Sequence, residues 1–323
     1  MAQSRQIHAH VSKNHTEENR TVPMKDKHNV HRIALRILHS IGVSATVGDL
    51  DLSPFINAED GEEYSVWRVT LGTNTYVLKQ AKEYETEIYT VFFEHVNGGA
   101  PRLLGICDEG ENIYLLIEYI RGDDMRKCDR ASLKKVLDAL IALQSAHWED
   151  KEHAAVGNSF EKSLVSRINR GKYLNDEALE EAFGAFLTAY QTVPRTLCHD
   201  DLLPFNVLVN DTGATLIDWE LAGILPYPTS LARLIAHGEE DRDAFFFMTG
   251  TDKQFAIDYY YEHLICQKGI TYADYRHTLD LFLLYEYCEW IMLGVKYNNT
   301  DSERYRHYLN KAKEHLKKMK EKT

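Results

Sequence analysis

The chain has 323 residues, of which 44% are hydrophobic and 27% are charged, as in ordinary globular proteins. This composition excludes a wholly disordered chain, and the length favours more than one structural unit, because single cores stop growing at roughly 250 residues. The 37 Lys and Arg residues stand against 49 Asp and Glu residues, a net charge of −12, which argues against nucleic acid as a partner because its phosphates would be repelled.

Residues 1–30 show almost no apolar periodicity and are predicted to form a flexible polar tail that includes His8, His10 and His15. They hold no apolar stretch of the kind that a secretory signal needs. No run of about 18 apolar residues follows, so no membrane span is expected either. The five cysteines form no CxxC pair, which favours a reducing cytoplasm over a disulfide framework.

Residues 31–120 combine helix and strand signals, and they are predicted to form a small N-terminal lobe. Runs rich in β-branched and aromatic residues predict strands, and spacing of three and four predicts helices. The predicted elements are a helix from residue 31, strands over 64–71 and 75–79 joined at Gly72, a helix over 82–95, and strands over 102–107 and 112–120. An antiparallel sheet with a helix on it follows from this order.

Residues 121–323 are mainly helical in pattern and are predicted to form a larger C-terminal lobe, which makes the fold class two-lobed α+β. The predicted helices are one after a capping Ser132, one over 161–193, one over 229–238 capped by Thr229 or Ser230, and three over 252–268, 273–296 and 301–321. One compact break, residues 195–219, holds two short apolar runs around a turn and predicts a hairpin.

This break carries the side chains most suited to chemistry. It contains Asp201 and Asn206 before the hairpin and Asp218 after it. Phosphoryl transfer requires a base for the acceptor hydroxyl and hard oxygen ligands for the divalent ion that holds the donor polyphosphate. Because a hairpin brings its two ends together, we expect Asp218 to lie beside Asn206.

The pattern H-x-D-x-x-x-x-N at 199–206, followed by I-D-W at 217–219, resembles the aminoglycoside phosphotransferase and choline-kinase-like family, which has a protein-kinase-like fold. The resemblance implies that Asp201 is the catalytic base and that His199 organises the loop. It also implies magnesium, the expected metal cofactor, on Asn206 and Asp218. The residues after the His and after the metal Asp differ from those of protein kinases.

The same resemblance implies a nucleotide site in the first lobe. Lys79 would bind phosphates at the end of its strand, held by an ion pair with Glu87, or with Glu83 as the weaker choice. Backbone groups near Glu118 and Ile120 would face an adenine, so ATP is the predicted donor.

The stretch expected to cover the nucleotide, residues 53–65, departs from the glycine-rich loop of the family. It has a single glycine, Gly61, and four carboxylates. A loop closes on phosphates through backbone amides that glycines expose. The departure leaves GTP open as the donor.

The acceptor is predicted to be a small molecule bound in the C-terminal lobe, where carboxylates and aromatic residues gather. Glu220 is a tentative acceptor contact, and the other candidates are Glu239, Glu240, Asp241, Asp243, Tyr285, Glu286, Tyr287, Glu289 and Trp290. Carboxylates and aromatic rings both attract cations. The predicted function is therefore ATP-dependent phosphorylation of a hydroxyl on a cationic molecule, with an aminoglycoside-like antibiotic favoured. A choline- or ethanolamine-kinase-like enzyme and a catalytically weak nucleotide-binding scaffold are the alternatives.

Overall fold

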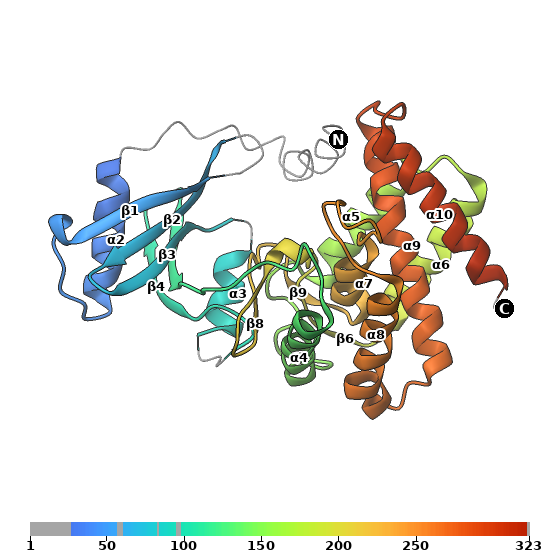
Figure 1. Ribbon diagram of the computed structural model, residues 1–323, viewed down its shortest axis with the longest axis horizontal. Helices are drawn as coiled ribbons and strands as arrows, with labels where there is room; N and C mark the ends of the chain where they lie inside the picture. Colours follow the sequence, from blue (N-terminus) through green and yellow to red (C-terminus); the bar gives the residue numbers. More distant parts are fainter. Residues whose placement is uncertain (1–26, 57–60, 83, 95–97, 322–323) are drawn as a thin grey trace.

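The computed structural model describes residues 27–56, 61–82, 84–94 and 98–321. A sheet with two helices forms one lobe and a larger helical lobe forms the other, side by side along the long axis of the molecule (Figure 1). The predicted two-lobed α+β class is thereby confirmed. Most of the expected tail, and Glu83, lie outside the described residues.

The small lobe is built on a five-stranded antiparallel sheet in the order β1-β2-β3-β5-β4. Its strands are β1 (Leu50–Ile56), β2 (Glu63–Leu71), β3 (Asn74–Gln80), β4 (Leu103–Asp108) and β5 (Ile113–Glu118). Four of them were predicted. The first was not, and residues 53–56 of the expected nucleotide-covering loop are part of it. The alternation of Leu50, Asp51 and Leu52 is the strand signal that was missed.

The two helices of the small lobe pack into different hydrophobic cores. Helix α2 (Lys27–Ser40) buries Ile33 and Ile37 against Leu78 and its neighbours, which form a separate apolar cluster of the small lobe. Helix α3 (Glu85–Phe92) instead places its apolar face in the core that continues through the large lobe. The position of α3 is therefore set by the large lobe.

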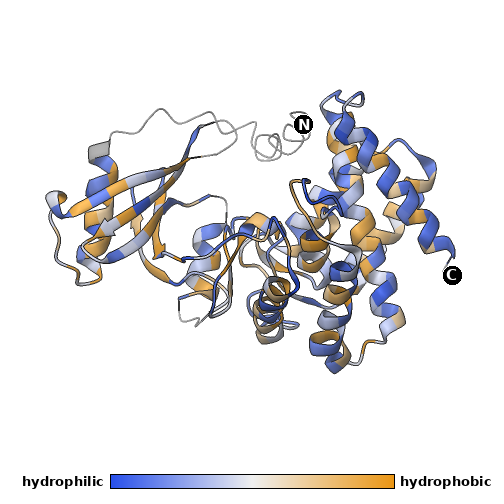
Figure 2. Cartoon of the chain, in the orientation of Figure 1, coloured by the Kyte–Doolittle hydropathy of each residue, from blue (hydrophilic) through white to orange (hydrophobic). Residues whose placement is uncertain are grey.

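The large lobe consists of seven helices among the described residues: α4 (Arg130–Ala146), α5 (Phe160–Gly171), α6 (Glu177–Thr192), α7 (Pro228–Ala236), α8 (Gly250–Tyr260), α9 (Tyr272–Lys296) and α10 (Glu303–Glu321). Residues 279–292 of α9 are all buried, and Figure 2 shows this central helix as mainly apolar beside a polar α10. Because α9 is buried on every side, it forms the axis of the lobe.

Two helix predictions in this lobe were wrong in detail. The segment 161–193 is not one helix, because α5 ends at Gly171 and Asp176 caps a new helix by accepting the N–H of Leu179. The N-cap of α4 is Asp129, whose side chain accepts the N–H groups of Ala131 and Ser132. Asp is as good a cap as Ser, so the sequence alone allowed either start.

Four short strands frame the predicted break: β6 (Arg195–Cys198), β7 (Val207–Val209), β8 (Ala214–Leu216) and β9 (Gly223–Pro226). The hairpin of β7 and β8 is confirmed, and β6 pairs with β9. The segment between the lobes pairs with β7, because Asp123 and Val209 exchange backbone hydrogen bonds of 2.9 and 2.8 Å.

The approach of this interlobe segment to β7 depends on Gly122. A Cβ at that position would lie 2.8 Å from the carbonyl oxygen of Val209. We expect Gly122→Ala to lower the free energy of unfolding by about 1–3 kcal/mol in urea denaturation, since backbone cannot move aside cheaply. Gly213→Ala is the control, because no atom lies within 4 Å of its added Cβ. Equal effects of the two substitutions would contradict this account of the contact.

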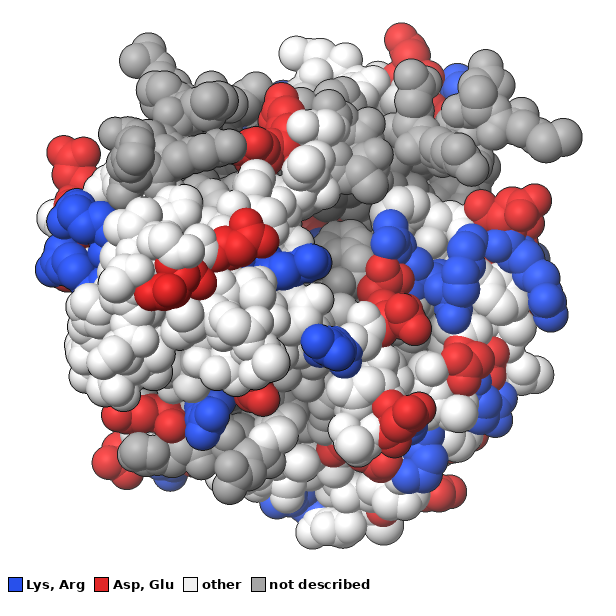
Figure 3. All heavy atoms as spheres, turned by 60° about the vertical axis from the view of Figure 1, so that its left-hand side comes forward, with Lys and Arg blue, Asp and Glu red and all other residues white. Residues whose placement is uncertain are grey.

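Acidic and basic side chains are interspersed on the face shown in Figure 3, without a continuous basic surface. Among the described helices, none is both long and apolar enough to cross a bilayer. The expectations of no nucleic-acid partner and of a cytoplasmic location stay predictions.

Candidate active site

The loop after β6 folds back on itself and brings Asp201 and Asn206 together. The carboxamide nitrogen of Asn206 donates to the backbone oxygen of Asp201 at 2.8 Å and lies 3.4 Å from its Oδ2. The turn Pro204–Asn206 is closed by a 2.8 Å bond from the Asn206 N–H to the carbonyl of Leu203. Two side chains predicted to share a site are therefore neighbours.

The hairpin returns Asp218 to this loop, as its predicted geometry requires. The N–H of Ile217 donates to the backbone oxygen of Asn206 at 2.9 Å, so the residue before Asp218 is bonded to the expected metal ligand. Asp218 has a φ of 67°, a left-handed conformation that Asp tolerates better than most residues. The expectation that Asp218 lies beside Asn206 is confirmed.

His199 is fully buried and joins the two halves of the site. Its Nε2 lies 2.7 Å from the carbonyl of Ile217, and its ring centroid is 4.6 Å from that of Trp219. Burial lowers its pKa to about 4, so the ring is neutral and donates through Nε2. These contacts support the organising role that the resemblance implied.

The residue that fixes the His199 backbone comes from α7. Ser230 accepts the backbone N–H of His199 at 2.9 Å, and it lies inside the first turn of α7. The prediction that Thr229 or Ser230 is the N-cap was wrong, because Pro228 begins the helix and Tyr227 holds the cap position. Pro is favoured at the first helical residue, which is the signal that was missed.

The neutral His199 makes an acid-sensitive contribution to stability. Between its ordinary pKa of 6.5 and its folded pKa of about 4, the unfolded chain takes up a proton that the folded chain excludes. The free energy of unfolding should therefore fall as the pH falls through this window, by roughly 3 kcal/mol from this group. Urea denaturation from pH 7 to pH 4 measures it.

The matched comparison is His199→Gln, which keeps a donor for the Ile217 carbonyl but does not titrate. This variant should lose stability less steeply below pH 6.5 than the wild type. The exposed His39→Gln serves as a control and should keep the wild-type slope. An unchanged slope in His199→Gln would contradict a buried neutral ring.

Lys79 is the residue before the last of β3, and its ammonium lies between the lobes. Nζ lies 2.7 Å from Oε1 of Glu85 and also bonds Oδ1 of Asp218. The predicted ion pair therefore forms with Glu85, and the choice of Glu87 was wrong. Glu87 instead accepts the N–H of Gly157 at 3.0 Å. Since two residues turn a helix by about 200°, Glu87 points away from the face that Glu85 presents to β3.

The two carboxylates that bond Lys79 differ in the direction of their pKa shifts. Glu85 is completely buried, and burial raises its pKa to about 7 despite the Lys79 ammonium. Desolvation also opposes ionisation of Asp218, but the charges of Lys79 and Lys82 and the hydrogen bond from Lys79 together lower the pKa of Asp218 to about 2. Asp218 is therefore the fixed negative charge of the site at neutral pH.

A comparison with protein-family models matches residues 56–261, more than half of the chain, to the phosphotransferase enzyme family. The chain belongs to this family. The matched range includes the loop with Asp201 and Asn206, the hairpin and Lys79, so the site described above lies inside the matched region.

Solved structures show that this chain has a protein-kinase-like fold. A choline kinase from Cryptosporidium parvum is 14% identical with a TM-score of 0.61, covering 91% of this chain and 97% of its own. A choline/ethanolamine kinase family protein from Mesorhizobium loti is 14% identical with a TM-score of 0.57, covering 90% and 94%. An amicoumacin kinase in complex with AMP-PNP and Ca²⁺ is 11% identical with a TM-score of 0.54, covering 92% and 94%.

Sequence relatives match a shorter part of the chain. Protein LicA of Haemophilus influenzae is 20% identical over 127 residues, which are 38% of this chain and 38% of the relative. A second LicA sequence of that species is also 20% identical over 127 residues, 48% of its length. The chain thus spans less than half the length of these relatives.

The predicted adenine-facing segment begins at Glu118, the last residue of β5. The backbone N–H of Glu118 donates to the carbonyl of Arg102 at 3.0 Å, so it is not free for a base. Ile120 lies two residues beyond the end of the strand, outside any helix or strand. The assignments of Glu118 and Ile120 to nucleotide binding stay predictions. At Glu118, an atom other than the backbone N–H would have to contact the adenine.

Glu220 is not among the residues that line the pocket adjoining Asp201. It lies 3.3 Å from Nζ of Lys82, on the side of Asp218 and Lys79. Burial, and then the charge of Asp218, raise its pKa. The tentative assignment of Glu220 to the acceptor therefore receives no support from its position.

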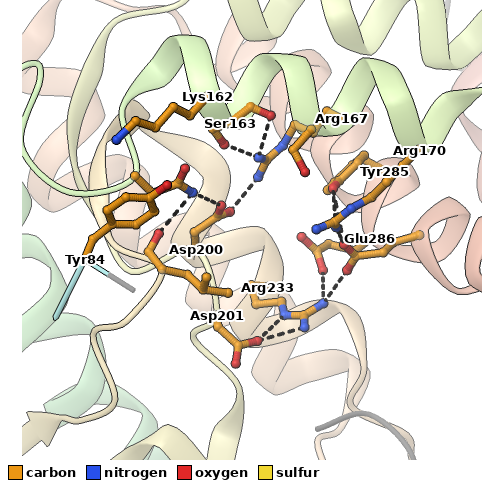
Figure 4. A pocket seen from close by; sticks show the side chains of 14 residues that line it. Tyr84, Lys162, Ser163, Arg167, Arg170, Asp200, Asp201, Arg233, Tyr285 and Glu286 are labelled. Carbon is orange, nitrogen blue, oxygen red and sulfur yellow. Dashed lines mark hydrogen bonds and ion pairs between the residues drawn. The ribbon is translucent and has the colours of Figure 1, made fainter. Parts of the chain in front are cut away.

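A pocket of about 230 Å³ adjoins Asp201 (Figure 4). Tyr285, Glu286 and Glu289 of α9 line it, as the sequence suggested. The remaining predicted acceptor residues are not in its lining. Tyr287 and Trp290 are buried, and Glu239 bonds Lys311.

Sequence reasoning missed the arginines of this pocket. Arg233 of α7 is buried and donates to Oδ1 of Asp201 through Nε at 3.1 Å and Nη2 at 2.8 Å. Its Nη1 bonds Glu286 and Glu289, each at 2.9 Å. Burial raises the pKa of Asp201 to about 6, and Arg233 opposes that rise. The only signal in the sequence was an Arg inside an otherwise apolar helix, which must find a partner when buried.

Proposed function

We propose that this phosphotransferase transfers the γ-phosphate of ATP to a hydroxyl of a small molecule. The observation that carries the proposal is that Asp201, which lines the pocket, contacts Asn206, whose backbone pairs with the residue before Asp218, and that Asp218 in turn forms an ion pair with Lys79. These groups supply a base, oxygen ligands and a phosphate-binding cation, which are the parts that phosphoryl transfer requires.

Asp201 is the proposed base. Arg233 holds its Oδ1 from one side, and the loop places Oδ2 near the carboxamide of Asn206. The carboxyl lines the pocket, so an acceptor hydroxyl bound there can hand its proton to it. The two bonds from Arg233 fix the orientation of the carboxylate before the acceptor binds, which lowers the entropic cost of reaction.

The residues present fit a magnesium ion. Because the nitrogen of the Asn206 carboxamide is used on Asp201, its oxygen remains as a ligand, and Asp218 is ionised and 37% exposed. Asn206 and Asp218 would hold the ion as the sequence resemblance implied. When bound, magnesium neutralises the charge of the phosphate oxygens.

Lys79 is the proposed partner of the donor phosphates, and Glu85 fixes its ammonium. The segment from Glu118 to Ile120 is the proposed adenine contact, and Glu87 has no direct part in it. ATP is the proposed donor because the family resemblance implies that backbone groups of this segment, which leads from β5 to the large lobe, bind an adenine ring.

The convergence of Lys79, Asp201, Asn206 and Asp218 favours a catalyst over a nucleotide-binding scaffold, because a scaffold has no use for the base. The narrower choice of an aminoglycoside-like or choline-like acceptor receives less support. Every pocket carboxylate that could attract a cation already bonds an arginine.

Release of ADP with and without candidate acceptors tests the proposal. We expect turnover that requires magnesium, prefers ATP to GTP and rises when the right hydroxyl compound is added. A stable phosphorylated product identified by mass spectrometry would complete the assignment. Absence of any magnesium-dependent ATP turnover across a broad acceptor panel would count against it.

A further inference from the structure

One wall of the pocket beside Asp201 is a basic helix face. Helix α5 contributes five of the fourteen lining residues, and none of the five is acidic: Lys162, Ser163, Ser166, Arg167 and Arg170. Their spacing places them on one side of the helix, and Figure 4 shows this helix running along the pocket. A bound acceptor would therefore lie against cations and hydroxyls.

Each carboxylate of the pocket bonds an arginine, and Arg233 is shared by three of them. The pairs are Arg167–Asp200 at 2.5 Å, Arg233–Asp201 at 2.8 Å, Arg233–Glu286 at 2.9 Å and Arg233–Glu289 at 2.9 Å, with Arg170 as a second partner of Glu289. An ammonium-rich acceptor would have to displace an arginine from its carboxylate. Since Arg167 and Arg233 are themselves buried, displacement would leave a buried charge unpaired, which is unfavourable.

Two cations of the wall keep unused binding capacity. The ammonium of Lys162 is exposed and lies 4.3 Å from the centroid of the Tyr84 ring, and no described carboxylate pairs with it. Arg170 bonds Glu289 and Tyr285 through Nη1, which leaves its Nε and Nη2 edge, and its side chain is 28% exposed. Both groups can donate to an oxyanion without breaking an existing pair.

We propose that the acceptor carries an oxyanion, a carboxylate or a phosphate, in addition to the hydroxyl that is phosphorylated, and that Lys162 binds this oxyanion, with Arg170 as a second cation at the other end of the α5 wall. The inference rests on the function proposed above and names its substrate class. The hydroxyl lies at Asp201, and the oxyanion lies along α5, within the length of one small molecule in a pocket of about 230 Å³. Lys162 and Arg170 then select against polycations as well as for anions, because two like charges repel.

The test compares acceptors that share a skeleton and differ in charge, read by ADP release. The carboxylate arm uses 4-hydroxybutyrate, 1,4-butanediol and 4-aminobutan-1-ol. The phosphate arm uses glycerol 3-phosphate and glycerol, and kanamycin and choline represent cationic acceptors. We expect kcat/KM for the anionic member of at least one arm to exceed that of its cationic or neutral partner by about tenfold or more, the effect of one good pocket contact. The arm that responds identifies the oxyanion.

Lys162→Glu is the decisive variant, because Lys162 is exposed and its replacement leaves the buried arginine pairs intact. It should abolish or reverse the preference for the anionic acceptor. Lys172→Glu is the control on the end of the same helix, where Nζ bonds Asn169 outside the pocket, and it should keep the preference.

Three results would overturn the inference while leaving the proposed function intact: a wild-type preference for the cationic acceptors, a charge preference that Lys162→Glu does not change, or no response to any acceptor while magnesium-dependent hydrolysis of ATP persists. A wild-type protein with no magnesium-dependent binding or turnover of ATP would overturn the proposed function as well.

Discussion

Asp201→Asn is expected to lower kcat by about a thousandfold or more, because removal of a positioned base costs on the order of 10²–10⁴-fold. The Asn side chain keeps an oxygen that can accept from Arg233, so the local packing survives. It cannot accept the proton of the acceptor. Steady-state ADP release measures the loss, and the affinity for a non-hydrolysable ATP analogue should stay within a few-fold of the wild type.

The control for this substitution is Asp211→Asn, in the exposed turn between β7 and β8. It changes the same charge a short distance along the chain and should leave kcat unaltered. If Asp201→Asn keeps wild-type turnover, Asp201 is not the base. If Asp201→Asn loses both turnover and cooperative unfolding, Asp201→Glu is the second variant. It keeps a carboxylate in a shifted position, so the protein should fold and still release ADP slowly.

Lys79→Met is expected to be the most destabilising of the site substitutions and to weaken nucleotide binding. It leaves Glu85, which is completely buried, without its ammonium partner. Breaking a buried ion pair on one side costs about 3–5 kcal/mol of unfolding free energy. Urea denaturation measures the stability, and calorimetric titration with the ATP analogue measures the binding.

The double variant Lys79→Met with Glu85→Gln separates the two effects. It removes the unpaired carboxyl, so it should regain much of the lost stability, while nucleotide binding stays weak. Glu87→Gln should leave nucleotide affinity near that of the wild type, because Glu87 bonds Gly157 rather than Lys79. A strong effect of Glu87→Gln with none from Glu85→Gln would show that the register of α3 described above is wrong.

Local patterns were enough to predict much of the fold. The predicted strands of the small lobe are runs rich in β-branched and aromatic residues, and the hairpin between Asn206 and Asp218 has its own turn at Asn210–Gly213. The meeting of Asp201, Asn206 and Asp218 follows from that hairpin, because its geometry depends on residues close in sequence.

The partner of Lys79 could not be predicted in the same way. Choosing between Glu85 and Glu87 requires the rotation of α3, which depends on where the helix begins. The residue at its N-cap position, Tyr84, makes no side-chain capping bond, so the sequence carries no start signal there. An error of two residues in the start of α3 would turn the opposite face of the helix toward Lys79.

The pocket was harder still, because its ion pairs join distant segments. Arg167 and Asp200 are 33 residues apart, and Arg233 and Glu289 are 56 apart. The sequence suggested acidic side chains in the acceptor site but gave no means of seeing that each of them bonds an arginine. A count of carboxylates alone therefore favoured a cationic acceptor.

The central claim is that Lys79, Asn206 and Asp218 form one magnesium–nucleotide site, and the affinity for a non-hydrolysable ATP analogue with and without magnesium tests it most directly. The account predicts that magnesium tightens binding to the wild type and has no such effect on Asp218→Asn. Binding that is equally tight in both proteins, with or without the ion, would contradict it.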